Sequence, residues 1–299
     1  MNHFISPRIM MILLLLWPFA VHAEGYEKLN RLEGFPTATY YSDGTRAQAE
    51  AMASRCANAM NYFKSHLEFT PDVTLLILSP ADWSDYTDFP VYGMPHYTSN
   101  STLVVASEDN DLWKSFIPPV DQLPVNLARQ ITNTYSDKHG NLSMQPFFDL
   151  LVIHELGHAY HFQAGINMQR LWLMEVFVNI FLHTYIAENE PELLPALTTF
   201  PQMVVETTKK EELQFTTLQQ MEENYNEIGS LHPVNYGWYQ CRWHVGSGRV
   251  YDEGGLQALK SLWYGLKNQE EVLDDEALIA FLSENTNKSL AEIPLKWDE

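Results

Sequence analysis

Residues 146–189 read PFFDLLVIHELGHAYHFQAGINMQRLWLMEVFVNIFLHTYIAEN, two long apolar runs separated by a short polar turn. Pro146 suits the first turn of a helix, and Gly165 suits the position just past a helix end. The pattern predicts one helix from Pro146 to about Gly165 and a second over residues 169–189. Because both runs are apolar on almost every side, we expect both helices to be buried.

The first half of the chain has an α/β pattern. Residues 45–66 carry Ala, Met and Tyr at helical spacing, whereas residues 73–78 are a continuous apolar run of strand length. Residues 91–107 contain a Gly-Met-Pro turn signal and a second apolar run at 102–106, which predict two further short strands. One of them should lie at a sheet edge, because proline cannot donate a ladder hydrogen bond.

The second half is predicted to be nearly all helical. A short helix at residues 125–135 and a polar stretch at 136–143 precede the long helices. Further helices are expected near residues 214–225, 235–245, 255–267 and 275–284. The fold class that we expect is α+β, with a small mixed-sheet subdomain at residues 24–145 and a mainly helical subdomain at 146–299. The helix that begins at Pro146 stands at their junction.

Charge and cysteine content exclude several classes of protein. The chain has 299 residues, with 38 acidic and 18 basic side chains, a formal charge of −20 and two cysteines. An excess of acid without Lys or Arg clusters disfavours binding to nucleic acid. Two cysteines also exclude a disulfide-dense scaffold. Cys56 and Cys241 are either a disulfide pair or two buried thiols, and the sequence favours neither.

Residues 1–23 have the features of a secretory signal peptide. The amino terminus and Arg8 supply positive charge, residues 9–20 are apolar, and Val21-His22-Ala23 offers small residues at the cleavage positions. An apolar run this short falls below the roughly 20 residues that a membrane-spanning helix needs. We therefore expect a secreted or periplasmic protein, without a membrane span in the mature chain.

The first long helix contains His154-Glu155-Leu156-Gly157-His158. Two histidines four residues apart project from one face of a helix, where both rings can bind one Zn²⁺. Glu155 lies on the side where a water on the metal would be, as a general base requires. The alternative is a coincidental motif in a metal-free secreted binding protein. Burial in an apolar helix argues against that alternative, because unpaired ionisable groups are costly there.

A catalytic zinc needs a third protein ligand, and the sequence offers two candidates. Glu175, in the apolar second helix, is the sole carboxylate between His158 and Glu188. His161 lies on the first helix, seven residues after His154. We favour Glu175, because His161 is displaced along the helix axis from a metal held between the first two histidines. Asn179 follows Glu175 by one turn, where it could accept a ring N–H from a ligand histidine or lie on the helix surface.

These two segments, His154 to His158 and Trp172-Leu173-Met174-Glu175, resemble the gluzincins, the zinc peptidases that include thermolysin-like enzymes and alanyl-type aminopeptidases. The resemblance covers residues 146–189. It implies a zincin-like fold and a third ligand, Glu175, on the following helix. The 16 residues between His158 and Glu175 form a slightly shorter connection than in those two branches. No Gly-x-Met-Glu-Asn string of the aminopeptidases is found, so the resemblance gives no support to exopeptidase action.

The residue that stabilises the oxyanion is expected in a later helix, as a Tyr or His that donates a hydrogen bond. The resemblance favours Tyr236 as this residue, followed by Tyr239 and then His232, although aromatic residues that only pack in the core would give the same pattern. The turn at residues 93–96 should lie near the edge strand with which an extended substrate pairs.

The sequence therefore predicts an exported zinc peptidase that hydrolyses peptide bonds in peptides or proteins. His154, His158 and Glu175 would hold Zn²⁺, Glu155 would act as general base, and Tyr236 or Tyr239 would stabilise the oxyanion. A secreted protein that binds zinc but acts only through interactions is the alternative. Substrate, cleavage specificity and oligomeric state do not follow from these motifs.

Overall fold

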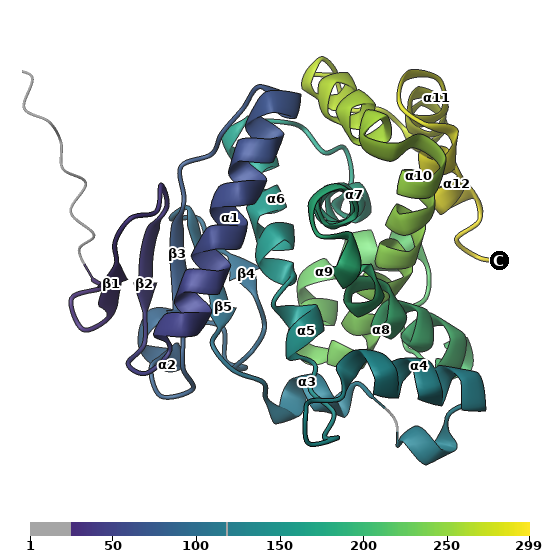
Figure 1. Ribbon diagram of the computed structural model, residues 1–299. Helices are drawn as coiled ribbons and strands as arrows, with labels where there is room; N and C mark the ends of the chain where they lie inside the picture. Colours follow the sequence, from purple (N-terminus) through teal and green to yellow (C-terminus); the bar gives the residue numbers. More distant parts are fainter. Residues whose placement is uncertain (1–24, 118) are drawn as a thin grey trace, which may run out of the picture.

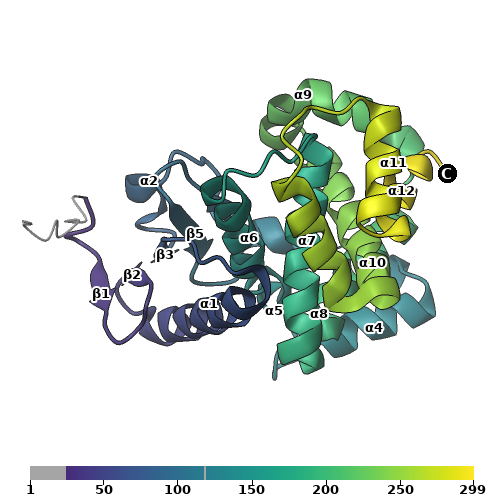
Figure 2. The same cartoon turned by 90° about the horizontal axis from the view of Figure 1, so that it is seen from above.

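The computed structural model describes residues 25–117 and 119–299. The predicted signal peptide at residues 1–23 therefore lies outside the described residues. A sheet stands at one end of the molecule and a larger group of helices at the other (Figures 1 and 2). The predicted α+β class is confirmed, with a small mixed sheet in the first half of the chain and helices after it.

The sheet has five strands in the order β1-β2-β3-β5-β4. They are β1 (Asn30–Leu32), β2 (Ala38–Tyr41), β3 (Thr74–Leu78), β4 (His96–Tyr97) and β5 (Thr102–Ala106). β2, β3 and β5 are parallel, whereas β1 and β4 are antiparallel to their neighbours. The two apolar runs are the inner strands β3 and β5, and β4 is the predicted edge strand. β1 and β2 were not predicted, because runs of three and four residues give too little periodicity.

Two helices cover the same face of the sheet. α1 (Arg46–Leu67) packs against β1, β2 and β3, and α6 (Leu151–Gln163) packs against β4 and β5 and against α1. Phe63 of α1 stacks on Phe181, which lies in the helix that follows α6 in the chain, with ring centroids 3.6 Å apart. The sheet, α1 and the helical half thus share one hydrophobic core, and α6 stands at their junction as predicted (Figure 1).

The prediction of one continuous helix from Pro146 is wrong. The structure has a short helix α5 (Gln145–Phe148), a turn, and then α6. The amides of Leu150 and Ile153 bond to carbonyl groups three residues back, at 3.1 and 3.0 Å, instead of four. These tighter bonds separate the two helices. Gly165 ends the segment with a φ of 66°, the left-handed conformation expected just past a helix end.

The second predicted helix is α7 (Leu171–Asn189), which crosses α6 closely. Every residue of α7 from Val176 to Ile186 is buried. At the crossing a Cβ atom on Gly157 would lie 3.1 Å from Cβ of Val178, so a glycine is needed for this approach. The short distance between the two helix axes brings side chains of α7 within reach of the histidines of α6.

The remaining helices are mostly in the second half. They are α2 (Trp83–Tyr86), α3 (Asp111–Ser115), α4 (Val125–Tyr135), α8 (Leu194–Thr207), α9 (Leu218–Leu231), α10 (Pro233–Lys267), α11 (Asp275–Asn285) and α12 (Lys288–Leu295), with short 3₁₀ turns at Val120–Gln122, Pro191–Leu193 and Lys210–Glu212. α8 and α12 were not predicted, because each contains an internal proline, Pro201 or Pro294, which usually ends a helix. None of the helices in the described part of the chain has the length and apolar character that crossing a membrane requires.

α10 replaces two separately predicted helices. It continues past residue 245 and kinks at Gly255, where φ is 54° and ψ is −153°. Glycines in the middle of α10 permit close packing, since a Cβ on Gly246 would lie 3.3 Å from Ile293 and one on Gly248 would lie 3.2 Å from His183. α10 packs against both α7 and α8, so tertiary contacts stabilise a glycine-rich helix that propensity alone does not favour.

Cys56 and Cys241 are two buried free thiols. Burial raises the pKa of the Cys56 thiol to about 12 and that of Cys241 still further. Of the two alternatives that the sequence left open, the structure therefore has the pair of thiols and no disulfide.

Candidate metal centre

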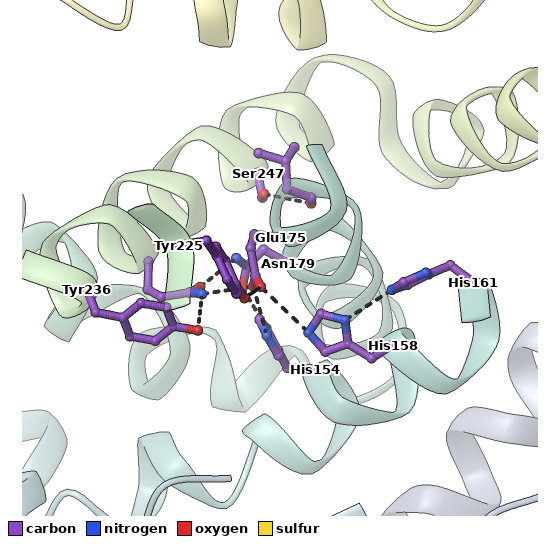
Figure 3. A network of polar contacts seen from close by, with 10 residues as sticks. His154, His158, His161, Glu175, Asn179, Tyr225, Tyr236 and Ser247 are labelled. Atoms are coloured by element: carbon purple, nitrogen blue, oxygen red, sulfur yellow. Dashed lines mark hydrogen bonds and ion pairs between the residues drawn. The ribbon is translucent and has the colours of Figure 1, made fainter. Parts of the chain in front are cut away.

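Three side chains from α6 and α7 meet in the interior of the molecule (Figure 3). Potential ligand atoms of His154, His158 and Glu175 all lie within 4.8 Å of one another. His154 Nε2 is 3.4 Å from Glu175 Oε2, and His158 Nε2 is 3.9 Å from Glu175 Oε1. This buried His/His/Glu group can hold a metal ion, and the structure brings together the three residues predicted as ligands.

The charges at this group fit a divalent cation. Burial alone would raise the pKa of Glu175, but the hydrogen bond from His154 and the nearby imidazoles hold it well below its ordinary value. Burial acts to lower the pKa of His154, but Glu175 and Glu155 outweigh it and the pKa is raised. For His158 burial prevails and lowers the pKa to about 4. An ionised carboxylate thus faces two imidazoles. A bound cation would take the place of the proton that the carboxylate and an imidazole otherwise share.

Both imidazoles are oriented through their second ring nitrogens. His154 Nδ1 lies 3.1 Å from Asn179 Oδ1, and His158 Nδ1 lies 3.1 Å from His161 Nε2. With a proton on each Nδ1, both Nε2 atoms are free to bind a metal on the side of Glu175. Asn179 has the position expected from its spacing to Glu175. His161 lies on the side of His158 that faces away from Glu175 and orients it, and it is not part of the metal-binding group (Figure 3).

Two further residues hold the carboxylate, and sequence reasoning missed both. The Tyr225 hydroxyl donates to Glu175 Oε1 at 2.5 Å, and Gln240 Nε2 donates to Glu175 Oε2 at 2.8 Å. Tyr225 comes from α9 and Gln240 from α10, so no spacing relates them to the motif. The one available signal was that Gln240 follows Tyr236 by four residues and so shares its helical face.

The three candidates for the oxyanion donor lie in different places. The Tyr236 hydroxyl accepts a hydrogen bond from Gln240 Nε2 at 3.0 Å and can donate its own proton to a ligand. Tyr239 points elsewhere, because its hydroxyl donates to the carbonyl of Thr217 at 2.8 Å. His232 lies 3.6 Å from Glu227 near the surface. Only Tyr236 is brought to the metal-binding group, so a catalytic role for Tyr239 has no geometric support.

Tyr236 keeps its proton at neutral pH. Burial, together with the charge of Glu175, raises the pKa of its phenol far above the ordinary value. Burial likewise raises the pKa of Tyr225. Both hydroxyls are therefore hydrogen-bond donors over the whole physiological range.

Two cavities meet at His154, Glu155 and Tyr236. The first, which we call the cleft, holds about 1240 Å³ of space including its open mouth, and β4, Phe162 and Tyr225 are among its walls. The second, which we call the aromatic pocket, holds about 640 Å³ of space, also including its open mouth, and extends between α5, α6 and α10. The metal-binding group is thus accessible from the cleft, in spite of its burial.

Glu155 lies beside the metal-binding group at the junction of the two cavities. It is 6% exposed, and burial raises the pKa of its carboxyl to about 7, although the charge of His154 opposes the rise. The second carboxylate, Glu175, adds to the increase. A carboxylate with a pKa near the working pH is suited to accept a proton and to return it.

Comparison of the whole chain with models of known protein families and with curated proteins gives no match. The likeness to gluzincins is therefore limited to the two motif segments on α6 and α7. A function has to be argued from the site itself.

Proposed function

We propose that this chain is an exported zinc peptidase of gluzincin type. The proposal depends on one observation, that His154, His158 and Glu175 converge beside Glu155 at a cleft. A purely structural zinc site has four protein ligands, whereas this group supplies three and faces a cavity, as a catalytic site requires. Secretion depends on the sequence of residues 1–23 and stays a prediction.

The donor set favours zinc over calcium or magnesium. Two imidazole nitrogens and one carboxylate are typical ligands of catalytic zinc, whereas the harder cations prefer oxygen ligands throughout. When bound, Zn²⁺ would supply Lewis acidity that polarises a carbonyl group and makes water more acidic. The contacts from Tyr225 and Gln240 to Glu175, and from Asn179 to His154, would fix the ligand atoms.

The side chains around the group account for the remaining steps of hydrolysis. Glu155 removes a proton from the attacking water and passes it to the departing amine. Tyr236 donates its hydroxyl proton as a hydrogen bond to the carbonyl oxygen, on which negative charge develops. Gln240 donates to a lone pair of this hydroxyl, so the proton of the hydroxyl is not used in that contact and can be donated to the substrate.

The edge strand β4 supports a peptide as the substrate. It borders the cleft, and among the strands of the described residues it pairs only with β5. Its outer edge can therefore pair with an extended peptide chain by β-strand addition, which recognises the backbone of any sequence. Such pairing would place a peptide bond across the cleft beside Glu155.

Two measurements test the proposal. The full chain, purified without a metal-affinity column, should contain about one zinc per molecule by elemental analysis. It should hydrolyse casein or an unstructured peptide, and a chelator should abolish the reaction until zinc is restored. Zinc without hydrolysis would favour the alternative of a non-catalytic zinc-binding protein, and absence of any bound metal would refute both.

A further inference from the structure

The walls of the aromatic pocket are apolar and almost uncharged. Four phenylalanines and a leucine, contributed by four segments of the chain, are among its lining residues: Phe116, Phe147, Phe148, Leu151 and Phe200. Among the described residues that line it, no Lys, Arg or Asp occurs, and the one carboxylate is Glu155 at the junction with the cleft. Such a surface favours a large apolar side chain and disfavours a charged one.

His244 is one of the polar residues that line this pocket, together with His154, Glu155, Tyr236 and Gln240. It is 9% exposed, and its ring centroid lies 5.6 Å from that of Phe147 and 6.2 Å from that of His154. His244 also lines a third cavity, which shares no lining residue with the cleft. It therefore lies on the wall of the aromatic pocket that faces away from the cleft.

The ring of His244 has polar atoms without a partner in the protein. Within residues 25–117 and 119–299, no side chain or backbone group forms a hydrogen bond with its ring, and the charges that act on it are those of His154, His183 and Glu175. His244 lines both the aromatic pocket and the third cavity, so its nitrogens border the open space of one or both of them. Both the neutral imidazole and the imidazolium ion have at least one N–H donor. A ligand that places an oxygen atom next to His244 would therefore gain a hydrogen bond.

We infer that the aromatic pocket binds a substrate side chain next to the scissile bond, and that His244 makes it select tyrosine over phenylalanine. This inference rests on the proposed peptidase function and names its substrate class. A tyrosine ring fits the phenylalanine-lined walls, and its hydroxyl pairs with the otherwise unpaired imidazole. Phenylalanine fills the same space but leaves the buried polar group unsatisfied, which costs affinity.

The test uses small probes and the zinc-loaded full chain. Isothermal titration with N-acetyltyrosinamide and N-acetylphenylalaninamide should give tighter binding of the tyrosine probe by about fivefold, the effect of roughly one net hydrogen bond. N-acetyllysinamide should not bind measurably. The variant His244→Leu should bring the ratio of the two affinities close to one, and His244→Gln, which restores a donor, should recover part of the preference.

A matched control comes from the same wall. Cys241 lines the pocket and has no polar role in this scheme, so Cys241→Ala enlarges the cavity and should weaken both aromatic probes by the same factor. The ratio of tyrosine to phenylalanine affinity should then stay as in the parent chain. Zinc content of each variant shows that the metal-binding group is intact.

Peptide cleavage separates this inference from the proposed function. Two peptides that differ only by Tyr or Phe are digested, and the cut sites are found by mass spectrometry. Cleavage beside tyrosine, with a preference that His244→Leu removes, supports both. Cleavage without a preference, or one unaffected by His244→Leu, overturns the role of His244 alone. Selective binding without cleavage of either peptide overturns the peptidase and leaves the pocket assignment standing.

Discussion

Gln240 Nε2 lies 2.8 Å from Glu175 Oε2, and this contact joins α10 to the metal-binding face of α7. The same nitrogen lies 3.0 Å from the hydroxyl of Tyr236, while Gln240 Oε1 accepts from Asn179 Nδ2 at 3.4 Å. One uncharged amide therefore orients a ligand carboxylate, the candidate oxyanion donor and the residue that holds His154. Its geometry does not change with pH, because an amide does not titrate in the physiological range.

Replacing Gln240 should weaken metal binding. Gln240→Leu keeps the approximate volume and removes the hydrogen bond to Glu175, so zinc affinity should fall by about 10- to 100-fold, as for other residues that orient metal ligands. Competition with a chromogenic chelator measures this affinity. Gln257→Leu, an exposed position on the same helix, is the control and should leave it unchanged. Equal affinities for the two variants would contradict the role of Gln240.

Glu155→Gln should separate zinc binding from hydrolysis. The amide keeps the size of the side chain but cannot accept a proton, so the rate should fall by at least about 100-fold while about one zinc per chain remains. Steady-state kinetics on a fluorogenic peptide and elemental analysis provide the two readouts. Undiminished turnover would show that another residue is the base.

Glu175 and His161 should respond differently to substitution. Glu175→Gln removes the charge that faces both imidazoles and should abolish stoichiometric zinc. His161→Phe removes only the partner of His158 Nδ1, so zinc should still bind, with affinity lowered by about 10- to 100-fold. Elemental analysis after dialysis distinguishes the two. Loss of all zinc from His161→Phe, together with its retention by Glu175→Gln, would reverse the assignment of the third ligand.

Gly157→Ala should destabilise the protein although alanine favours helices. The new methyl group would lie 3.1 Å from Val178 Cβ and push α7 away from α6, at a cost of about 1–3 kcal/mol that exceeds the gain in helix propensity of about 1 kcal/mol. Gly229→Ala in α9 is the control, since its nearest neighbour lies at an ordinary 3.9 Å. Urea denaturation should give a lower free energy of unfolding for Gly157→Ala and an equal or higher one for Gly229→Ala.

Asp149 should make stability depend on pH. Burial raises the pKa of its carboxyl from 3.8 to about 6, partly opposed by Gln48 and Arg55. Between these values the folded state retains a proton that the unfolded state has lost, so the free energy of unfolding decreases as pH rises from about 4 to 6. Asp149→Asn should remove this decrease and raise the free energy of unfolding by about 2 kcal/mol at pH 7. This value is smaller than the full pKa shift would give, because the side chain is only half-buried and solvent screens its charge.

The same two proteins provide an internal control for Asp149. Near pH 3.5 the carboxyl is mostly protonated in both states, and the parent chain and Asp149→Asn should then be nearly equal in stability. Denaturant midpoints measured from pH 3.5 to 7.5 show the difference. A constant gap between the two curves would mean that the substitution acts through packing or hydrogen bonding and not through titration.

The sequence alone was sufficient to predict relations between residues that lie close together in the chain. His154 and His158 lie on one face because α-helical geometry places residues four apart side by side. The apolar runs predicted α7, β3 and β5 because a continuous apolar run indicates a buried segment whose length distinguishes a strand from a helix. Asn179 could be placed by the same rule, one turn beyond Glu175. These relations need no knowledge of how the elements pack.

Only the tertiary structure decided which distant side chains reach the site. The helix crossing at Gly157 brings Glu175 to the histidines, the packing of α9 and α10 on α7 supplies Tyr225 and Gln240, and the course of α10 points Tyr236 inward and Tyr239 toward Thr217. The same packing keeps α8 and α10 helical in spite of Pro201 and several glycines. Local periodicity predicts on which face of a helix or strand a side chain lies. The distances between side chains of different elements are fixed by close packing in the core, and a binding site depends on these distances.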